Sequence, residues 1–293
     1  MRELNGKVAV ITGGASGMGR AFARRFAREG MRMVVADVAA DALEQLTREL
    51  KSAGHDAIGV LTDVSRAEAV EHLARVTLDT YGGVHLLCNN AGVSGGRGHA
   101  RFHVYADPPA IWEATLNDWQ WITGVNYWGV AHGIRVFVPI MLQQNEDGHI
   151  VNTASISGLV PGGNVYGATK HAVVSMSESL RMDLQRRGAW GRLGVTCLCP
   201  TLINTDIYTG WRHRPEALRD EEPAPSEAEL ERLRGVYATG LPPEHVADLL
   251  LEAVLQNEFY VIPNHSVDTR IRERMEEILN RRDLHVSQST SAE

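Results

Sequence analysis

The stretch that decides the fold is VAVITGGASGMGRAFARRFAREG, residues 8–30. It begins with a short apolar run, which is typical of a strand covered on both faces. It ends with apolar residues three and four positions apart before a glycine, a spacing typical of an amphipathic helix. The turn between them, TGGASGMG at 12–19, lets backbone N–H groups approach a phosphate at the positive end of the helix dipole.

The same alternation of apolar runs and helical patterns continues along the 293-residue chain. It predicts right-handed βαβ units and a single-domain, Rossmann-like, doubly wound parallel α/β sheet of about seven strands flanked by helices. The domain is expected to span residues 1–282, followed by a disordered polar tail at 283–293. The predicted strands are residues 8–12, 33–37, 57–61, 85–89, 149–153, 194–199 and 259–262.

The composition narrows the class of protein. Hydrophobic residues make up 44% of the chain, charged residues 22%, and the net charge of -7 argues against a nucleic-acid surface. Cys88, Cys197 and Cys199 lie in strand-like runs, so we expect small core residues in a reducing compartment. No signal-like segment and no apolar run of about 20 residues occur, which predicts a cytoplasmic protein with no membrane partner.

Two long connections interrupt the alternation, at about 93–117 and 204–239. Connections of this length in a compact domain are often lids or binding segments. Both follow predicted strand ends, and open α/β sheets bind ligands beyond the carboxyl ends of their strands. We therefore expect these two insertions to form walls of one substrate pocket.

Asp37 ends the second predicted strand and bears on the choice of nucleotide. A carboxylate at this place accepts hydrogen bonds from both ribose hydroxyls and repels a 2′-phosphate, so it favours NAD over NADP. Two alternatives remain at this point. The glycine-rich turn could be only a tight connection, and Asp37 could cap the following helix, alone or in addition.

Tyr166 and Lys170 stand four residues apart at the start of a helical pattern, so their side chains share a face. Any amphipathic helix can carry this pair by accident, but here a nucleotide-binding pattern precedes it. The chain resembles the short-chain dehydrogenase/reductase family from about residue 6 to 263. The matching pieces are TGGASGMG at 12–19, DV at 63–64, NNAG at 89–92, VNYWGV at 125–130, NTAS at 152–155, YGATK at 166–170 and CPTLINT at 199–205.

The resemblance implies four catalytic residues. Tyr166 would exchange a proton with the substrate oxygen, Ser155 would orient that oxygen, and Lys170 would bind the nicotinamide ribose and lower the pKa of the tyrosine. Asn126 would hold a water molecule between the lysine and solvent. Ser157 competes for the serine role, because the gap from Ser155 to Tyr166 is short for the family.

The resemblance also implies which residues contact the cofactor. Asp63 and Val64 would lie beside the adenine, and Ile203 and Thr205 would touch the nicotinamide carboxamide. Asn89 is expected to brace the sheet instead. Thr201 replaces the usual glycine after the sixth strand, which leaves the path of that loop open. The expected cofactor-binding set is Gly13, Ser16, Gly17, Met18, Gly19, Asp37, Asp63, Val64, Asn90, Ala91, Gly92, Tyr166, Lys170, Pro200, Ile203 and Thr205.

The resemblance implies NAD-dependent interconversion of a secondary alcohol and a ketone. The chain is similar to bacterial members that act on bulky, often aromatic, alcohols, among them the Cα-dehydrogenases of lignin-derived aryl alcohols. A non-catalytic NAD-sensing protein and a reaction at a C=C or C=N bond remain alternatives. Two alternatives remain for Trp211: its side chain contacts the substrate, or it packs only against its own loop. The expected substrate-binding set is Ser155, Tyr166, Val160, Tyr208 and Trp211, with Ser94 as a further candidate.

The remaining expectations concern charges and assembly. We expect the side chains of Arg212 and Arg214 to be solvated charges on a loop. His99 and His103 have the spacing of a metal pair on a helix, but their glycine-rich surroundings argue against a metal. The family likeness implies a homo-oligomer, dimer or tetramer, formed by helices at about 116–144 and 166–187. Residues 270–282 predict an amphipathic packing helix, with an apolar face of Ile271, Met275, Ile278 and Leu279 that could lie at a subunit contact.

Overall fold

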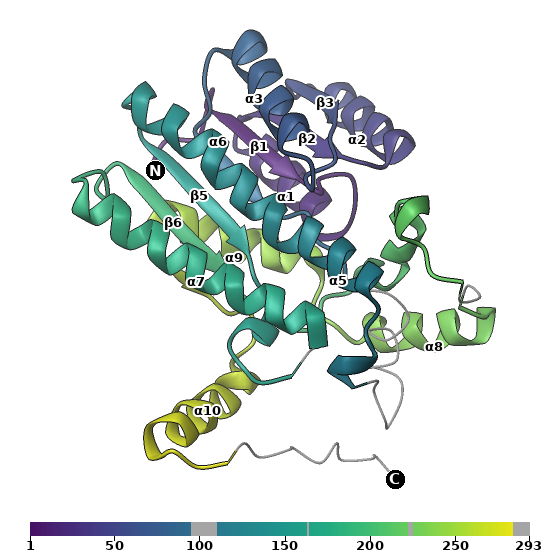
Figure 1. The fold of residues 1–293 in the computed structure, drawn as a ribbon. Coiled ribbons are helices and arrows are strands. Elements are labelled where there is room, and N and C mark those ends of the chain that lie inside the picture. The colour runs from purple at the N-terminus through teal and green to yellow at the C-terminus, as the bar shows by residue number, and fades with distance from the viewer. Residues whose placement is uncertain (95–109, 163, 222–224, 284–293) are drawn as a thin grey trace.

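The computed structural model describes residues 1–94, 110–162, 164–221 and 225–283. Its centre is a parallel sheet with the strand order β3-β2-β1-β4-β5-β6-β7 (Figure 1). The chain builds outward from β1 to β3 and then returns beside β1 to build in the other direction, which is the doubly wound topology that the sequence predicts. The strands are β1 (Val8–Thr12), β2 (Arg32–Asp37), β3 (Ala57–Leu61), β4 (Leu86–Asn89), β5 (Gly148–Thr153), β6 (Leu193–Leu198) and β7 (Tyr260–Val261).

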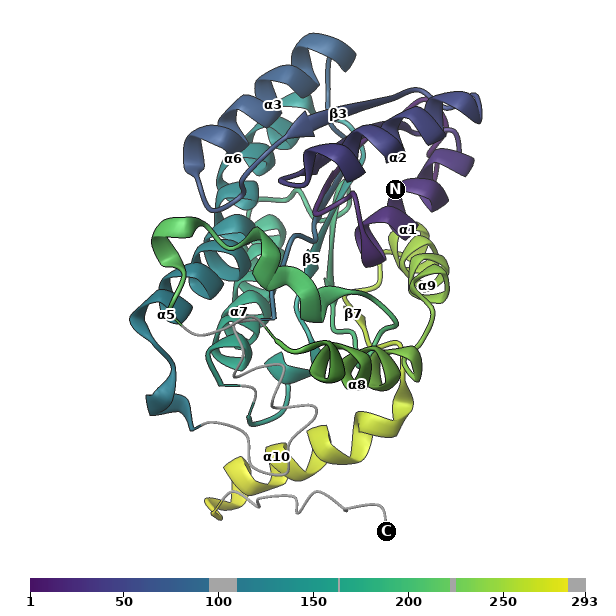
Figure 2. The same cartoon turned by 90° about the vertical axis from the view of Figure 1, so that its right-hand side faces the viewer.

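Helices cover both faces of the sheet, as Figures 1 and 2 show. One face carries α1 (Gly17–Arg28), α2 (Ala40–Ser52) and α9 (Pro243–Gln256). The opposite face carries α3 (Ala67–Tyr81), α6 (Gly129–Gln144) and α7 (Asn164–Arg186). Beyond these two layers lie α5 (Leu116–Thr123), α8 (Glu227–Ala238) and α10 (Asp268–Asn280). Of the helices described, none is both long and apolar enough to span a membrane.

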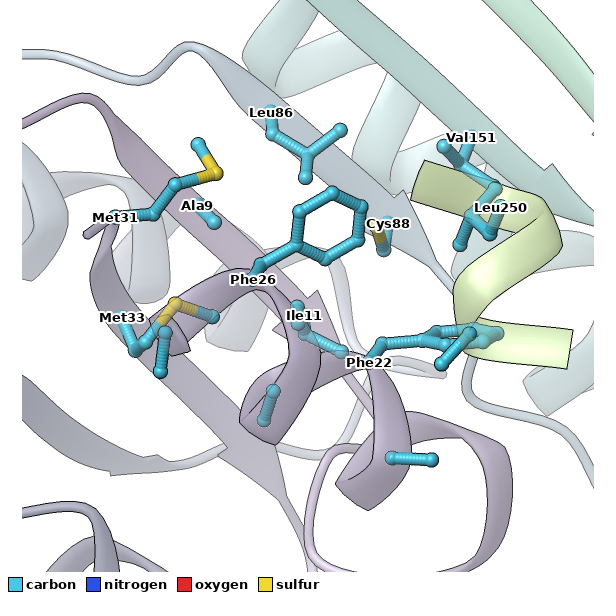
Figure 3. Packing of buried hydrophobic residues seen from close by; sticks show 14 of the residues in the cluster. Ala9, Ile11, Phe22, Phe26, Met31, Met33, Leu86, Cys88, Val151 and Leu250 are labelled. Atoms are coloured by element: carbon cyan, nitrogen blue, oxygen red, sulfur yellow. The ribbon is translucent and has the colours of Figure 1, made fainter. Parts of the chain in front are cut away.

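The strands are continuously apolar because both of their faces are buried. In β1, Ala9 and Ile11 face the α1 side, while Val8 and Val10 face the α6 side. Phe22 of α1 packs among these residues without solvent exposure, as does its neighbour Phe26 (Figure 3). Each such side chain contributes roughly 1.5–3 kcal/mol by leaving water. The predicted role of the three cysteines as small, free core residues is confirmed: all are buried thiols.

Of the two long connections, the structure describes most of 204–239 but only the two ends of 93–117. The connection at 204–239 includes three short elements, η4 (Ile207–His213), η5 (Glu216–Leu218) and α8. In the connection at 93–117, residues 95–109 lie outside the described residues, and with them His99 and His103. The described part includes the short turn η1 (Ile111–Glu113). Most of the predicted disordered tail, residues 284–293, also lies outside the described residues.

Helix α10 leaves its apolar face largely uncovered within this chain. The side chains of Met275, Ile278 and Leu279 are 48%, 52% and 70% exposed. The helix projects from the end of the sheet at which β7 lies (Figure 2), so its apolar face meets no described layer. A polar contact holds it instead: the Arg274 guanidinium donates to the Leu159 carbonyl at 2.7 Å. The predicted amphipathic helix is present, and its contact with another subunit remains a prediction.

Candidate functional site

The candidate site lies at the carboxyl edge of the sheet, where β1 and β4 diverge toward opposite halves of the fold. Ligands bind at such switch points because the loops that follow adjacent strands turn away from each other there. Motifs from β1, β2, β4, β5 and β6 all follow their strands at this edge. The parallel topology thus collects residues that are far apart in the sequence.

The turn after β1 needs its glycines. Gly13 has φ +61°, and a Cβ on it would stand 2.7 Å from the Cα of Ala91. Gly17 has φ +50°, and a Cβ there would stand 3.1 Å from the Cγ2 of Thr205. Because L side chains rarely adopt such φ values, other residues would strain this turn. The turn therefore brings together segments expected to bind the two ends of one dinucleotide.

Helix α1 offers an uncapped N-terminus. Its N-cap residue, Ser16, makes no side-chain capping bond, and its first turn carries no acidic residue. The N–H groups of the first turn of a helix have no partner inside the helix, and they favour an anion. Gly17, Met18 and Gly19 supply these groups. The chemistry of this helix end fits the pyrophosphate of a dinucleotide.

Asp37 is fixed by two backbone contacts at the end of β2. Its Oδ2 accepts from the Ala15 N–H at 2.9 Å, and its Oδ1 accepts from the Ala39 N–H at 3.0 Å. The first contact ties the carboxylate to the glycine-rich turn. The second satisfies the residue before α2, so part of the alternative capping role is present as well. Each carboxylate oxygen keeps a further lone pair for a ribose hydroxyl.

Thr12 organises this turn, and sequence reasoning did not single it out. Its Oγ1 accepts from the N–H groups of Asn90 at 3.0 Å and of Ala91 at 3.1 Å. The Asn90 amide donates to the carbonyls of Thr12 at 3.1 Å and of Gly13 at 3.3 Å. A hydroxyl at the end of an otherwise apolar strand was the available signal. Asn90 thus supports the turn, as well as being a candidate for cofactor contact.

Asn89 lies deeper and behaves as a brace. Its amide nitrogen donates to the Asn152 side-chain oxygen at 2.9 Å and so joins β4 to β5. Further along the edge, the Asp63 carboxylate accepts from the Ser65 hydroxyl at 2.7 Å. Val64 is buried, and its carbonyl lies 3.0 Å from the His132 ring nitrogen Nδ1. The contacts of Asp63 and Val64 with an adenine remain a prediction.

Lys170 is buried beside Tyr166 on α7. Its Nζ donates to the Thr153 carbonyl at 2.8 Å and lies 5.5 Å from the centre of the Tyr166 ring. Only 3% of the lysine is exposed. Burial disfavours its charged form and lowers the pKa of Lys170 to about 8. The helical spacing of four therefore brings the two side chains together, as the sequence predicts.

Ser155 approaches the tyrosine from the end of β5. Its side chain is hydrogen-bonded to Tyr166, which lowers the pKa of the phenol, but burial has the larger effect and raises it. The chain alone therefore keeps the phenol protonated. The lowering implied by the resemblance needs the positive charge of an oxidised nicotinamide in addition. The competing Ser157 donates its backbone N–H to the Ser155 Oγ at 3.1 Å and so supports Ser155.

Asn126 lies in a π-helical turn, η2 (Gly124–Trp128), between α5 and α6. Its amide accepts from the Val93 N–H at 2.8 Å and donates to the Val93 carbonyl at 2.9 Å. A Cβ on Gly92 would stand 3.4 Å from the Asn126 Oδ1 and 3.5 Å from the Lys170 Nζ. The asparagine, the lysine and the loop after β4 thus converge. π-helical turns of this kind are frequent at functional sites.

The loop after β6 closes the cofactor side of the site. The Pro200 carbonyl accepts from the Ile156 N–H at 2.9 Å, which fixes the loop against the strand end that carries Ser155. Ile203 is 5% exposed and forms an isolated parallel β-bridge with Leu241. With Thr205 beside the glycine-rich turn, the loop follows a defined path even though Thr201 stands where the family usually has glycine.

The expected substrate residues lie on three segments. Val160 is 4% exposed and Tyr208 is 7% exposed. The Tyr208 ring rests on the Tyr237 ring with 5.1 Å between their centres. The Ser94 hydroxyl donates to the Ile207 carbonyl at 3.2 Å, which ties the loop after β4 to η4. Their contact with a substrate remains a prediction.

Tyr237 of α8 was missed by sequence reasoning. Burial raises the pKa of Tyr237, and the charges of Tyr166 and Tyr208 raise it further. This coupling places Tyr237 in the neighbourhood of the predicted catalytic tyrosine. Its sequence context, EAELERLRGVYA, looks like an ordinary amphipathic helix, so the chain offered no signal for it.

Arg214 corrects an expectation. It is 7% exposed, not a solvated loop charge. Its guanidinium donates to Asp118 at 2.8 Å and to Asp220 at 3.0 Å, and it lies 5.2 Å from the centre of a Trp121 ring. Its neighbour Arg212 is exposed, as expected. The partner on α5 is 96 residues away in the sequence, which is why the local pattern gave no hint of burial.

The described residues hold no cluster of three or more His, Cys, Asp or Glu side chains suited to a metal ion. The candidate site consists of the Tyr166 phenol, the Lys170 ammonium, the Ser155 hydroxyl and the Asn126 amide, on the same edge of the sheet as the glycine-rich turn. Such a set can position a nucleotide and move a proton at one substrate oxygen.

Comparison with known proteins agrees with this geometry. The family model for short chain dehydrogenases matches residues 7–216. A solved structure of a short chain dehydrogenase/reductase from Burkholderia phymatum, in complex with NAD, is 45% identical, with a TM-score of 0.86; the match covers 97% of this chain and 98% of that chain. The CLA biosynthesis dehydrogenase/reductase of Lactiplantibacillus plantarum is 31% identical, and the match covers 98% of each chain. The C alpha-dehydrogenase of a Sphingobium species is also 31% identical, with 96% of this chain and 88% of the relative covered.

Proposed function

The chain belongs to the short chain dehydrogenase family, and on this premise we propose that it interconverts a secondary alcohol and a ketone with NAD. The family predicted from the motifs is thereby confirmed, and the chain is an oxidoreductase of that family. The observation that carries the finer proposal is the convergence of Tyr166, Lys170 and Ser155 beside the glycine-rich turn. The four proposed catalytic residues are these three and Asn126.

The mechanism follows from what each side chain can do. NAD, when bound, supplies the hydride acceptor and a positive ring. In oxidation, Tyr166 takes the hydroxyl proton of the alcohol; in reduction, it returns that proton to the substrate oxygen. Ser155 orients the same oxygen by a hydrogen bond. Lys170, held by the Thr153 carbonyl, places an ammonium beside the phenol and favours its ionised form.

Asn126 has a positioning role in this proposal. Its amide fixes both backbone groups of Val93, and its oxygen lies near the lysine ammonium across Gly92. This arrangement keeps the loop after β4 at a constant distance from Lys170. A water molecule held there would connect the lysine to solvent, as the family resemblance implies.

The choice of NAD over NADP rests on Asp37. Its carboxylate is oriented by the glycine-rich turn, and the next residues, Val38, Ala39 and Ala40, supply no positive charge to receive a 2′-phosphate. A 2′-phosphate would meet a fixed negative charge. The related structure from Burkholderia phymatum contains NAD, which supports this choice.

The proposed substrate is bulky and apolar or aromatic. Tyr208 and Trp211 contribute aromatic surface from η4, and Val160 contributes an aliphatic surface from the loop before α7. Apolar walls with few polar groups are typical of sites for such molecules. The similarity to a C alpha-dehydrogenase supports the same substrate class.

We also propose a cytoplasmic homo-oligomer. Trp128, at the start of α6, is 50% exposed, and Met182 on α7 is 49% exposed. Large apolar side chains on two outer helices are suited to an interface between copies. Size-exclusion chromatography with light scattering tests this part, because a monomer at all concentrations would contradict it.

The proposed reaction is tested by assaying a panel of aryl secondary alcohols and ketones with NAD(H) and NADP(H), following the absorbance of the reduced nicotinamide. Tyr166→Phe is expected to lower kcat by about 10²–10⁴-fold, because it removes the group that moves the proton, while NADH affinity stays within about twofold. Tyr260→Phe is the matched control, since Tyr260 is 44% exposed and bonds to Glu178.

The alternatives give different results. Tight NADH binding without turnover of any alcohol or ketone would favour the sensing protein. Turnover restricted to activated C=C or C=N substrates would favour the other reaction. A Tyr166→Phe variant as fast as the wild type would refute the proposed mechanism.

A further inference from the structure

We propose that the substrate carries a neutral hydrogen-bond acceptor oxygen on its apolar part, away from the reacting carbon, and that the indole N–H of Trp211 donates to this oxygen. The inference rests on the proposed function and narrows its substrate class. Suitable molecules are aryl or alicyclic secondary alcohols and ketones that bear an ether, hydroxyl or carbonyl oxygen on the ring.

The indole of Trp211 has a buried donor. Its Nε1 is inaccessible to solvent and has no hydrogen-bond partner among the described residues. Buried indole N–H groups usually find a partner, and one left without a partner costs about 1–3 kcal/mol. An acceptor on a bound molecule removes this cost. Packing within its own loop would account for the position of the Trp211 ring. It would not account for a buried indole N–H without a hydrogen-bond partner among the described residues.

The indole lies next to the catalytic residues. It packs in the apolar cluster that contains Val93 and Val165. Val93 is the residue whose backbone groups hold the Asn126 amide, and Val165 precedes Tyr166 on α7. Trp211 and Val93 thus pack against one apolar cluster, and that cluster includes the residue before Tyr166. Among the described residues, Tyr166 itself is not part of that cluster, so we expect the indole N–H to meet a part of the substrate away from the reacting carbon.

The segment that carries the indole, η4, is anchored at both of its ends. The Arg214 N–H donates to the Trp211 carbonyl at 3.1 Å, and the buried Arg214 guanidinium is paired with Asp118 of α5. At the other end of η4, Ile207 is bonded to Ser94. A donor fixed at both sides loses little entropy on binding and can discriminate between substrates. Arg214 is in this sense a positioning residue for Trp211.

The charge around Arg214 favours a neutral acceptor. Its guanidinium is already paired with two carboxylates, Asp118 and Asp220. The Arg219 guanidinium donates to the backbone carbonyl of Arg214 at 3.2 Å. Asp220 also accepts from Thr115 at 2.9 Å and from Asn117 at 2.9 Å. The buried Arg214 guanidinium is therefore not free to pair with a substrate carboxylate, whereas an ether, hydroxyl or carbonyl oxygen needs no such cation. This favours a neutral acceptor at Trp211.

The test compares substrates that differ in one acceptor. Wild type and Trp211→Phe are assayed with acetophenone and with 4-methoxyacetophenone, and with the corresponding alcohols. We expect Trp211→Phe to lower kcat/KM for the methoxy compounds by about tenfold, mainly through KM, and for the unsubstituted compounds by less than about twofold. Trp112→Phe, at a position that is 84% exposed, is the control and should change neither. An equal loss on both substrates, or no loss, overturns the inference.

A binding measurement separates this inference from the proposed reaction. In protein with isotope-labelled tryptophan, the indole N–H resonance of Trp211 is identified by its loss in Trp211→Phe. Adding 4-methoxyacetophenone to the complex with NADH is expected to move this resonance downfield, and acetophenone to leave it nearly unmoved. Failure of every turnover assay would refute the proposed function, yet the selective shift would still support the acceptor contact. A resonance that responds equally to both ketones, or to neither, overturns it.

Discussion

The two ends of the site are held by different kinds of contact. At the phosphate end, the Asp37 carboxylate meets a backbone N–H only 22 residues away, and turn and helix end belong to one βαβ unit. In the segment from 206 to 220, which we propose as a wall of the substrate pocket and call the lid, the anchoring bonds link residues 96 and 113 positions apart. The phosphate end combines local backbone geometry with the Thr12–Asn90 contacts over 78 residues, whereas the lid is anchored by long-range contacts. A local motif can therefore describe part of the first and not the second.

The difference also concerns how much each end depends on one residue. The glycine-rich turn is joined to the sheet by the hydroxyl of Thr12, by the amide of Asn90 and by the carboxylate of Asp37. The lid relies on the guanidinium of Arg214, which two carboxylates share. Loss of that cation leaves both carboxylates without their ion-pair partner, although Asp220 keeps its bonds from Thr115 and Asn117, so the lid is expected to be the more vulnerable end.

The largest effect is therefore expected for Arg214→Met. Breaking a buried ion pair by removing one partner typically costs about 3–5 kcal/mol. We expect amide hydrogen exchange in residues 207–220 to accelerate by at least about a hundredfold and KM for the ketone to rise, while NADH affinity stays unchanged. Arg212→Met is the matched control, because Arg212 is exposed two residues away. Unchanged exchange in the lid would show that Arg214 does not hold it.

Lys170, between the two ends, gives an effect of intermediate size through its pKa. Burial lowers this pKa from its ordinary 10.5 to about 8. Between these values the unfolded chain binds more protons than the folded one, so the stability supplied by this group rises with pH. The penalty for burying the charged lysine is fully present below about pH 8 and disappears above about 10.5. The expected change across this interval is on the order of 3 kcal/mol.

The comparison of wild type with Lys170→Met isolates this effect. The free energy of unfolding in urea is measured for both proteins across the same pH interval. We expect the difference, wild type minus variant, to increase as the pH rises from about 8 to 10.5. Lys51→Met serves as a control, because Lys51 is exposed at the end of α2. A difference that stays flat or decreases would contradict the lowered pKa.

The smallest effect is expected at the phosphate end, for Asp37→Asn. The side-chain oxygen of asparagine can still accept from the Ala15 N–H, so the turn should survive. The negative charge that faces a 2′-phosphate is lost, and we expect the ratio of the NADP to the NAD dissociation constant to fall by about tenfold, roughly 1.4 kcal/mol. Asp41→Asn, on exposed α2, is the control. A ratio equal to that of the wild type would show that Asp37 does not set the cofactor preference.

How far the site could be predicted depended on the range of the contacts. The proximity of Tyr166 and Lys170 was predictable because helical spacing places them on one face, whereas their proposed roles came from the family resemblance. Ser155 could be chosen over Ser157 from the motif, and the structure adds that Ser157 supports it through its backbone. Thr12 was missed although its hydroxyl at the end of an apolar strand was a signal, and Tyr237 gave no signal because a tyrosine in an amphipathic helix usually has a packing role. Arg214 was misjudged for a related reason: its carboxylate on α5 is distant in the sequence.

The fold followed a similar division. Continuous apolar runs alternating with helical patterns predicted the doubly wound sheet, because both faces of each strand had to be buried. The same reasoning predicted α10 and its apolar side, but Met275 and Leu279 remain exposed within this chain, and the predicted subunit contact is still a prediction. Periodicity states that a helix has an apolar side and does not state what covers it.

The sequence by itself determined the order of strands and helices, the phosphate-binding turn and the Tyr166–Lys170 pair. These depend on backbone preferences and on spacings of a few residues. Only the tertiary structure decided that Arg214 is buried, that Tyr237 lies near Tyr166 and that the Trp211 nitrogen lacks a partner among the described residues. The physical reason is that burial and charge pairing depend on which segments meet in space, and chain entropy lets distant segments meet only when the whole fold forms.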